Sequence, residues 1–242
     1  MTPSNAPGPP TAVVVQNTRS GGPGRVGAWL REAGIGLEVL RPYNGEALPQ
    51  ALGGRPLLVL GGGFLPDDDE RAPWLPATRR LVAQALDDGT PVLGICLGGQ
   101  LLAQVAGGRV RARHGQPEFG STQIRLRPEA ADDPLLYGLG ATVTAIERHV
   151  DAITELPSDA SWLASSAACP HQAFRVGARA WGVQFHPEAE AERIAGWDRD
   201  RLARQGFDRD RLHAEAVAEE GVTASVWSVF TRRFAQVCAR LP

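Results

Sequence analysis

The sequence predicts an α/β fold: a mostly parallel, doubly wound sheet flanked by helices, with an antiparallel extension and a helical C-terminal appendage. Three observations lead to this prediction. Short apolar β-branched runs alternate with amphipathic stretches in the first half of the chain, which is typical of βαβ units. Later segments are shorter and alternate apolar with polar residues, as antiparallel strands do. From residue 189 onward the chain is rich in Ala, Arg and Glu and favours helix.

The first half contains the elements expected of the parallel sheet. Buried strands are expected at residues 12–15, 37–40, 57–60 and 91–95. Helices are expected at residues 25–32, 78–86 and 97–105. In the second of these helices Leu81, Val82 and Ala85 have helical spacing, and Gly89 is placed to end it.

The second half contains the elements expected of the antiparallel extension and the appendage. Strands are expected at residues 122–126, 142–146, 162–165, 173–176 and 181–185. A D-R-D-R-L sequence occurs twice, at residues 198–202 and 208–212, and is interpreted as two solvated helical turns.

The 242 residues are interpreted as one large domain, because no polar linker of about 15 residues divides them. A disordered leader is expected at residues 1–11, the α/β domain at residues 12–188, and a helical part packed on the same domain at residues 189–242. The leader is rich in Pro and Gly and lacks the basic and apolar regions of a signal peptide.

Composition argues against several classes of function. The net charge is -2 and the basic residues form no stripe, so we expect no nucleic-acid partner. No apolar run approaches the roughly 20 residues of a membrane span. The cysteines, Cys96, Cys169 and Cys238, lack paired spacing, which argues against a CxxC-type zinc site and indicates a reducing compartment, the cytoplasm. Cys169 and Cys238 are interpreted as small buried hydrophobes.

The strongest local signal surrounds Cys96. This cysteine follows an expected strand, precedes an expected helix, and has Gly94 and Gly98 two residues to either side. Such a pattern is typical of a nucleophile elbow, a tight turn with no space for side chains at the flanking positions. The helix N-terminus favours the thiolate form of a cysteine placed there. Cys96 is therefore the candidate nucleophile.

A nucleophile of this kind requires hydrogen-bond donors for the oxyanion that forms during attack. The backbone N–H of Leu97, directly after the cysteine, is one natural donor. The second is expected from a neighbouring loop at a strand end, where the candidates are Gly61, Gly62 and Gly63.

The candidate general base is His186, which ends an apolar strand. Glu188 follows two residues later, and side chains at this spacing in an extended chain project to the same side. Cys96, His186 and Glu188 thus have the residue types of a catalytic triad. A role for His186 and Glu188 at a strand end and a helix start is the structural alternative. His149 and Asp151 have the same spacing, so a divalent metal held by both pairs is a further alternative, which no metal motif supports.

These residues resemble a known family, the class I (triad-type) glutamine amidotransferases. The G-I-C-x-G-x-Q segment at residues 94–100 and the G-V-Q-F-H-P-E segment at residues 182–188 match its two signature motifs. Further segments resemble the glutaminase domain of GMP synthase and its stand-alone relatives, and the resemblance covers residues 12–188. A proline is common in the family where Gly63 or Phe64 stands here, so the glycine loop departs from the pattern.

The resemblance implies hydrolysis of the side-chain amide of L-glutamine through a γ-glutamyl thioester on Cys96. It implies that His186 protonates the departing ammonia, that Glu188 orients His186, and that Gly62 and Leu97 donate to the oxyanion. It also places Gln100, Gly61 and Gly63 near the substrate, without a cofactor or metal.

The resemblance leaves the acceptor of the ammonia open. The sequence contains neither a Ser-Gly-Gly-x-Asp pyrophosphatase loop nor a Walker A motif, so a separate synthetase partner is expected to use the ammonia. Two alternatives remain. One is a γ-glutamyl hydrolase or peptidase with the same triad, and the other is a non-catalytic regulatory subunit that binds glutamine.

Overall fold

The computed structural model describes residues 10–240. Its strands are β1 (Thr11–Val15), β2 (Gly36–Leu40), β3 (Leu57–Val59), β4 (Val92–Ile95), β5 (Arg109–Arg111), β6 (Glu118–Leu126), β7 (Thr142–His149), β8 (Ala152–Glu155), β9 (Ser161–Ser165), β10 (Ala173–Val176) and β11 (Ala180–Val183). Its α-helices are α1 (Gly24–Glu32), α2 (Leu75–Asp87), α3 (Leu97–Val105), α4 (Glu192–Ala195), α5 (Arg199–Ala203) and α6 (Arg209–Ala239). The expected leader falls mostly on residues 1–9, which lie outside the described residues.

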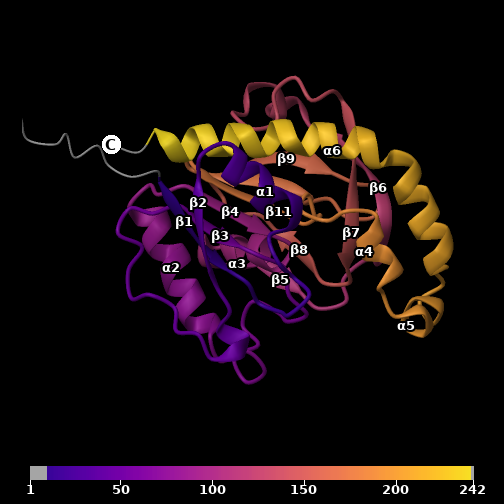
Figure 1. The fold of residues 1–242 in the computed structure, drawn as a ribbon, viewed down its shortest axis with the longest axis horizontal. Coiled ribbons are helices and arrows are strands. Elements are labelled where there is room, and N and C mark those ends of the chain that lie inside the picture. The colour runs from indigo at the N-terminus through magenta and orange to yellow at the C-terminus, as the bar shows by residue number, and fades with distance from the viewer. Residues whose placement is uncertain (1–9, 241–242) are drawn as a thin grey trace, which may run out of the picture.

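One large sheet organises the fold (Figure 1). Its nine strands have the order β2-β1-β3-β4-β11-β10-β9-β6-β7, while β5 and β8 form a small antiparallel pair. The strands from β2 to β11 in this order pair in parallel, and those from β11 to β7 pair antiparallel. The predicted fold class, a mostly parallel sheet with an antiparallel extension, is therefore confirmed.

Helices cover both faces of the sheet. Side chains of β1 alternate between two cores: Ala12 and Val14 pack in the core with α1 and α6, and Val13 and Val15 pack in the core with α2 and α3. Burial on both faces explains why this strand is apolar at every central position. The C-terminal helix α6 runs along the sheet beside α1 in Figure 1 and places Trp227, among other aromatic residues, in the first core.

Several element boundaries differ from the predicted ones. Strand β6 begins at Glu118 and β7 ends at His149, because these ends pair with each other and extend the hairpin beyond its apolar centre. Strand β11 ends at Val183 and, although predicted within the antiparallel extension, pairs in parallel with β4 on one side. The short β5 and β8 were not predicted, since three or four residues carry too little periodicity.

The two D-R-D-R-L segments each begin a helix. The Asp198 carboxylate accepts a hydrogen bond from the Arg201 N–H at the start of α5, and Asp208 accepts from the N–H groups of Asp210 and Arg211 at the start of α6. The similarity of the segments thus reflects the same N-capping requirement. Among the described residues, no helix is both long enough and apolar enough to cross a membrane.

Candidate active site

Cys96 lies on the turn between β4 and α3, with backbone angles φ 52° and ψ -107°. A positive φ is strained for a residue other than glycine, and such strain is frequent at functional sites. Close backbone contacts explain the flanking glycines. A Cβ on Gly94 would collide with the carbonyl group of Gly98, and a Cβ on Gly98 would collide with the carbonyl oxygen of Val59. The turn therefore has the elbow geometry that the sequence predicts.

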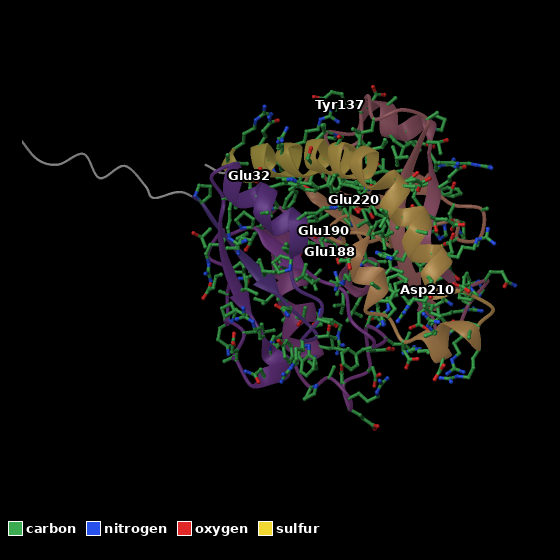
Figure 2. All side chains as sticks on the ribbon, turned by 45° about the vertical axis from the view of Figure 1, so that its right-hand side comes forward. Glu32, Tyr137, Glu188, Glu190, Asp210 and Glu220 are labelled. Carbon is green, nitrogen blue, oxygen red and sulfur yellow. The ribbon has the colours of Figure 1, made fainter. Side chains whose placement is uncertain are left out.

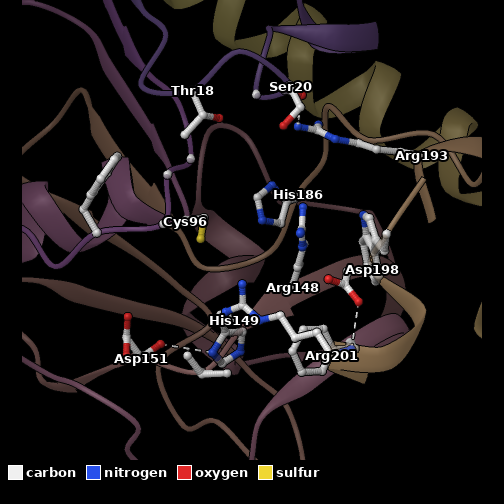
Figure 3. A pocket seen from close by; sticks show the side chains of 18 of the residues that line it. Thr18, Ser20, Cys96, Arg148, His149, Asp151, His186, Arg193, Asp198 and Arg201 are labelled. Atoms are coloured by element: carbon white, nitrogen blue, oxygen red, sulfur yellow. Dashed lines mark hydrogen bonds between the residues drawn. The ribbon is translucent and has the colours of Figure 1, made fainter. Parts of the chain in front are cut away.

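A cavity of about 310 Å³ opens at the carboxyl ends of β3, β4 and β11. Cys96 and His186 both line it, and Figure 3 shows the imidazole beside the thiol. Gly61 lies close to both residues, because a Cβ on this glycine would lie 3.0 Å from His186 Cε1 and 3.5 Å from Cys96 Cβ. The fold thus brings together two residues that are about 90 positions apart in the sequence.

His186 is fixed by its backbone and by Glu188. Its N–H donates to the Ile146 carbonyl oxygen at 2.8 Å, and its Nδ1–H donates to Glu188 Oε1 at 2.8 Å. The Nε2 atom is buried and has no hydrogen-bond partner within residues 10–240. Glu188 Oε1 also accepts from Arg193 at 3.2 Å. The imidazole therefore has a fixed orientation and one nitrogen available for chemistry.

The charges of this group stabilise each other. Burial opposes the imidazolium, but the nearby charges of Glu188 and Cys96 outweigh it and raise the pKa of His186 to about 10. Burial likewise opposes ionisation of Glu188, yet His186 and Arg193 hold the pKa of this carboxyl below its usual value. His186 and Glu188 therefore form a buried pair in which each stabilises the charged form of the other.

The predicted glycine loop lines the same cavity at Gly61, Gly62 and Gly63. Gly62 packs against the first turn of α3, where a Cβ would lie 2.7 Å from Leu97 Cδ2. Leu97 is the first residue of α3, and its side chain is buried away from the cavity. Its N–H belongs to the first helical turn, whose donors have no partner within the helix. Leu97 thus offers a backbone group only.

Gln100 lines the cavity from the first turn of α3 and is buried. Its amide nitrogen donates to the Asp151 carbonyl oxygen at 3.2 Å and to Gln184 Oε1 at 3.1 Å. Gln184 in turn donates to Cys96 Sγ at 3.7 Å. Sequence reasoning missed this contact, although Gln184 belongs to the same motif as His186.

His149 lines the cavity and lies at the centre of a buried polar cluster. Its Nδ1 lies 3.1 Å from the Asp151 carbonyl oxygen and its Nε2 lies 3.0 Å from Glu118 Oε2, and both nitrogens donate when the ring is doubly protonated. Burial opposes this charge, but Glu118 and Glu147 outweigh it and raise the pKa of His149 to about 9. The Glu147 carboxyl has no surface exposure, and burial raises its pKa to about 8.

The metal alternative requires His149, Asp151, His186 and Glu188 to converge, and they do not. His149 pairs with Glu118, while the Asp151 carboxylate accepts from the Arg113 N–H at 2.9 Å. In the described part of the chain, the one group of candidate ligand atoms comprises Glu118, His149 and Cys169, within 4.8 Å of one another. Burial raises the pKa of the Cys169 thiol to about 12, so this cysteine is a neutral thiol.

A mainly parallel sheet with a thiol, an imidazole and a carboxylate at the carboxyl ends of its strands defines an α/β protein with a cysteine-centred site. The chain belongs to the class-I glutamine amidotransferase family, whose model matches residues 20–195. Glutamine hydrolysis is the activity of this family.

Individual proteins that are similar to this chain are consistent with this family. The chain is 38% identical over 160 residues to a GMP synthase (glutamine-hydrolysing) of Porphyromonas gingivalis, covering 66% of this chain and 29% of that protein. It is 38% identical over 163 residues to one subunit of the glutamine-hydrolysing GMP synthase of Thermoplasma volcanium, covering 66% of this chain and 75% of that protein. A crystal structure of a glutamine amidotransferase from Thermotoga maritima superposes with a TM-score of 0.83 at 25% identity, covering 94% of this chain and 98% of that one.

Proposed function

We propose that this chain hydrolyses the side-chain amide of L-glutamine through a covalent intermediate on Cys96. The Cys96 thiolate attacks the γ-carbonyl carbon, and the His186 imidazolium donates its Nε2 proton to the amide nitrogen. The C–N bond breaks, ammonia leaves, and a γ-glutamyl thioester remains. His186 then takes a proton from water, which attacks the thioester and releases glutamate and the Cys96 thiolate.

The observation that carries this proposal is the geometry of His186. Its Nδ1 is bound to Glu188 at 2.8 Å, its buried Nε2 has no partner among residues 10–240, and the residue lines the same cavity as Cys96. Glu188 fixes the ring and stabilises its charged form, as the third member of a triad does. The strained backbone of Cys96 supports the same assignment, because strain of this kind is retained where function requires it.

The remaining candidate residues have roles around the substrate in this proposal. The N–H groups of Gly62 and Leu97 donate to the oxyanion of the tetrahedral intermediate. Gly61 and Gly63 contact the substrate through their backbone, and Gln100 Oε1 accepts from it. Both N–H groups of the Gln100 amide are already bound within the protein, which leaves that oxygen as its available atom.

Ammonia release from L-glutamine tests the chemistry. We expect activity in the wild-type protein and its complete loss in Cys96→Ala, with Cys238→Ala as the matched control because Cys238 is buried in the core at a distance from the cavity. Equal release by Cys96→Ala would refute the assignment. Calorimetric binding of glutamine without any consumption would favour the non-catalytic regulatory role instead.

We also propose that a separate synthetase receives the ammonia. The chain matches 29% of the length of the P. gingivalis GMP synthase but 75% of the T. volcanium protein, which is named as one subunit of such an enzyme. Co-purification from native lysate, followed by a glutaminase assay, tests this proposal. A partner that stimulates glutamine hydrolysis supports it, and a captured set of proteins without that effect contradicts it.

We further infer that residues 189–242 belong to the same domain as residues 12–188. Helix α6 buries Trp227, Phe230 and Phe234 completely in the core that it shares with α1 and the sheet. Removal of α6 would expose this apolar surface, so the α/β part is expected to require the appendage for folding.

A further inference from the structure

Two arginines, Arg148 and Arg201, line the cavity around Cys96 and have no acidic partner among residues 10–240. Of the three arginines in the cavity, only Arg193 forms an ion pair within the described residues, with Glu188 at 3.2 Å. The cavity's other two carboxylates bind backbone N–H groups: Asp151 accepts from Arg113, and Asp198 accepts from Arg201, both at 2.9 Å. Figure 3 shows the side chains of Arg148 and Arg201 in the hollow beside His186 and His149.

The position of Arg148 relates it to the leaving group. Ile146 of β7 forms an antiparallel bridge with His186, so the two side chains project to the same face. Arg148 follows two residues later on the same strand and shares that face. His186 is the residue that protonates the leaving nitrogen in the proposed mechanism. Arg148 therefore projects to the same face as the imidazole that meets the leaving nitrogen in the proposed mechanism.

A segment of the appendage contributes Arg201 to the cavity and contacts Arg148. The Arg148 guanidinium lies over the Trp197 ring, 5.2 Å from its centre, and Trp197 is 5% exposed and packs edge-on against Phe119. Arg201 projects from α5. Trp197, Arg201 and the adjoining residues follow residue 195, where the match to the family model ends. This part of the cavity is built by a segment outside the family match.

Glutamine carries a single carboxylate, on its α-carbon, whereas the cavity offers two arginines that have no acidic partner within residues 10–240. Partial burial lowers the pKa of Arg148, the positive charges of Arg193 and Arg201 lower it further, and Cys96 opposes this. The guanidinium groups are like charges in one cavity and therefore repel one another. A carboxylate bound between them would relieve this repulsion. The leaving group of glutamine is ammonia, which has no carboxylate. A leaving amine that carries a carboxylate would supply one on the side where Arg148 lies.

We propose that Arg148 and Arg201 bind a carboxylate on the leaving amine, and that the chain thereby also hydrolyses γ-glutamyl amino acids and γ-glutamyl peptides. This second activity rests on the proposed Cys96 chemistry. Cys96 forms the same γ-glutamyl thioester, the C–N bond breaks, and the amino acid or peptide leaves with the proton from His186. Water then releases glutamate.

The test compares two substrates that differ only in the carboxylate, γ-glutamylglycine and γ-glutamylglycinamide. For the wild-type protein we expect kcat/KM to be at least about tenfold higher for γ-glutamylglycine, because a charge-assisted contact to one arginine has this magnitude. A ratio near one would overturn the proposal.

Two single substitutions test whether the preference for γ-glutamylglycine depends on Arg148 and Arg201. In Arg148→Gln and in Arg201→Gln we expect the ratio of the two kcat/KM values to fall to between one and three. Arg199→Gln is the matched control, since Arg199 belongs to the same short helix as Arg201, pairs with Asp210 and does not line the cavity. Both substrates are compared in the same variant, so a lower fraction of active protein reduces the two kcat/KM values equally and leaves their ratio unchanged. An unchanged ratio in both cavity variants would overturn the assignment.

A binding measurement distinguishes failure of this inference from failure of the proposed Cys96 chemistry. Calorimetry on Cys96→Ala measures affinity for both compounds without turnover, and we expect tighter binding of γ-glutamylglycine. If wild-type protein consumed neither compound nor glutamine, the proposed function would fail, while this affinity difference would still support the subsite. If glutamine were consumed and the affinities were equal, the subsite alone would be refuted.

Discussion

Glu220 of α6 forms an ion pair with Arg25 of α1, and the two side chains together hold the loop that carries Glu188. Glu220 Oε2 accepts from the Ala191 N–H at 2.7 Å, and Arg25 Nε donates to the Pro187 carbonyl oxygen at 3.0 Å. Figure 2 shows Glu188 and Glu220 near each other where α6 passes this loop. The appendage therefore contacts the backbone on both sides of a candidate triad residue.

Loss of the Glu220 carboxylate is expected to weaken both stability and catalysis. Arg25 is 5% exposed, and removal of its partner in Glu220→Ala leaves a buried charge, which costs about 3 kcal/mol of unfolding free energy. The freed loop is expected to lower kcat for glutamine more than it changes KM, since Glu188 orients His186 and does not hold the substrate. Denaturant unfolding and steady-state kinetics measure the two effects.

Glu215→Ala is the control for this prediction, because Glu215 lies on the same helix in an exposed pair with Arg211. Its stability is expected to change by less than about 1 kcal/mol, as is usual for surface ion pairs. Equal effects of the two substitutions would show that the Arg25–Glu220 pair does not support the loop.

The pH dependence of glutamine hydrolysis is expected to reflect His186. Its pKa of about 10 means that the imidazolium is present at neutral pH, so kcat/KM is expected to fall only as the pH rises through about 10. Glu188 stabilises the charged ring, and Glu188→Gln is therefore expected to move this decline to lower pH. The pH profiles of kcat/KM for the two proteins provide the measurement.

Glu192→Gln serves as the matched substitution, since Glu192 is exposed and pairs with His213 at 3.2 Å. In Glu192→Gln the decline of kcat/KM is expected to remain at the same pH as in the wild-type protein. If Glu188→Gln retained the wild-type profile as well, Glu188 would have no influence on the proton affinity of His186.

The candidate triad could be predicted from sequence because each of its motifs is local. The glycines around Cys96 mark a tight turn, and the two-residue spacing of His186 and Glu188 places their side chains together. The carboxyl ends of neighbouring parallel strands then bring the motifs to one edge of the sheet, as β4 and β11 do. The same reasoning predicted the fold class.

The outer part of the cavity could not be predicted in this way. Arg148, Trp197 and Arg201 come from β7, the segment before α5, and α5 itself, and their meeting depends on how the appendage packs. No periodicity or spacing in the sequence relates residues so far apart. The buried pairing of Glu118 with His149 was missed for a similar reason, because it depends on the register of β6 and β7.

Replacing an elbow glycine with alanine adds one methyl group and is expected to lower the free energy of unfolding. In Gly98→Ala the new Cβ collides with the carbonyl oxygen of Val59, which is backbone and cannot rotate away. We expect a loss of at least about 3 kcal/mol in unfolding free energy, the upper range for overpacking. Gly221→Ala is the matched helical control, because nothing lies within 4 Å of its Cβ position. It is expected to gain about 0.5 kcal/mol, and equal losses in both variants would contradict the role of the collision.

The buried cluster around His149 is expected to make the protein less stable in alkaline solution. Glu147 and His149 have folded-state pKa values of about 8 and about 9, both above their usual values of 4.5 and 6.5, so the folded protein binds more protons than the unfolded chain. Their stabilisation is complete below the unfolded pKa values and is lost as the pH rises through the folded ones. Between about pH 6.5 and 8 both groups contribute, and the unfolding free energy is expected to fall most steeply there.

Glu147→Gln separates the two contributions. The variant keeps a side chain of similar shape facing His149, Glu118 and His186 but cannot ionise, so the slope between pH 6.5 and 8 is expected to fall to about half of the wild-type slope. Denaturant unfolding at a series of pH values measures this slope. Glu155→Gln, an exposed substitution on β8, is expected to retain the wild-type slope. An unchanged slope in Glu147→Gln would mean that Glu147 is already ionised in the folded protein, stabilised by His149 at 3.6 Å.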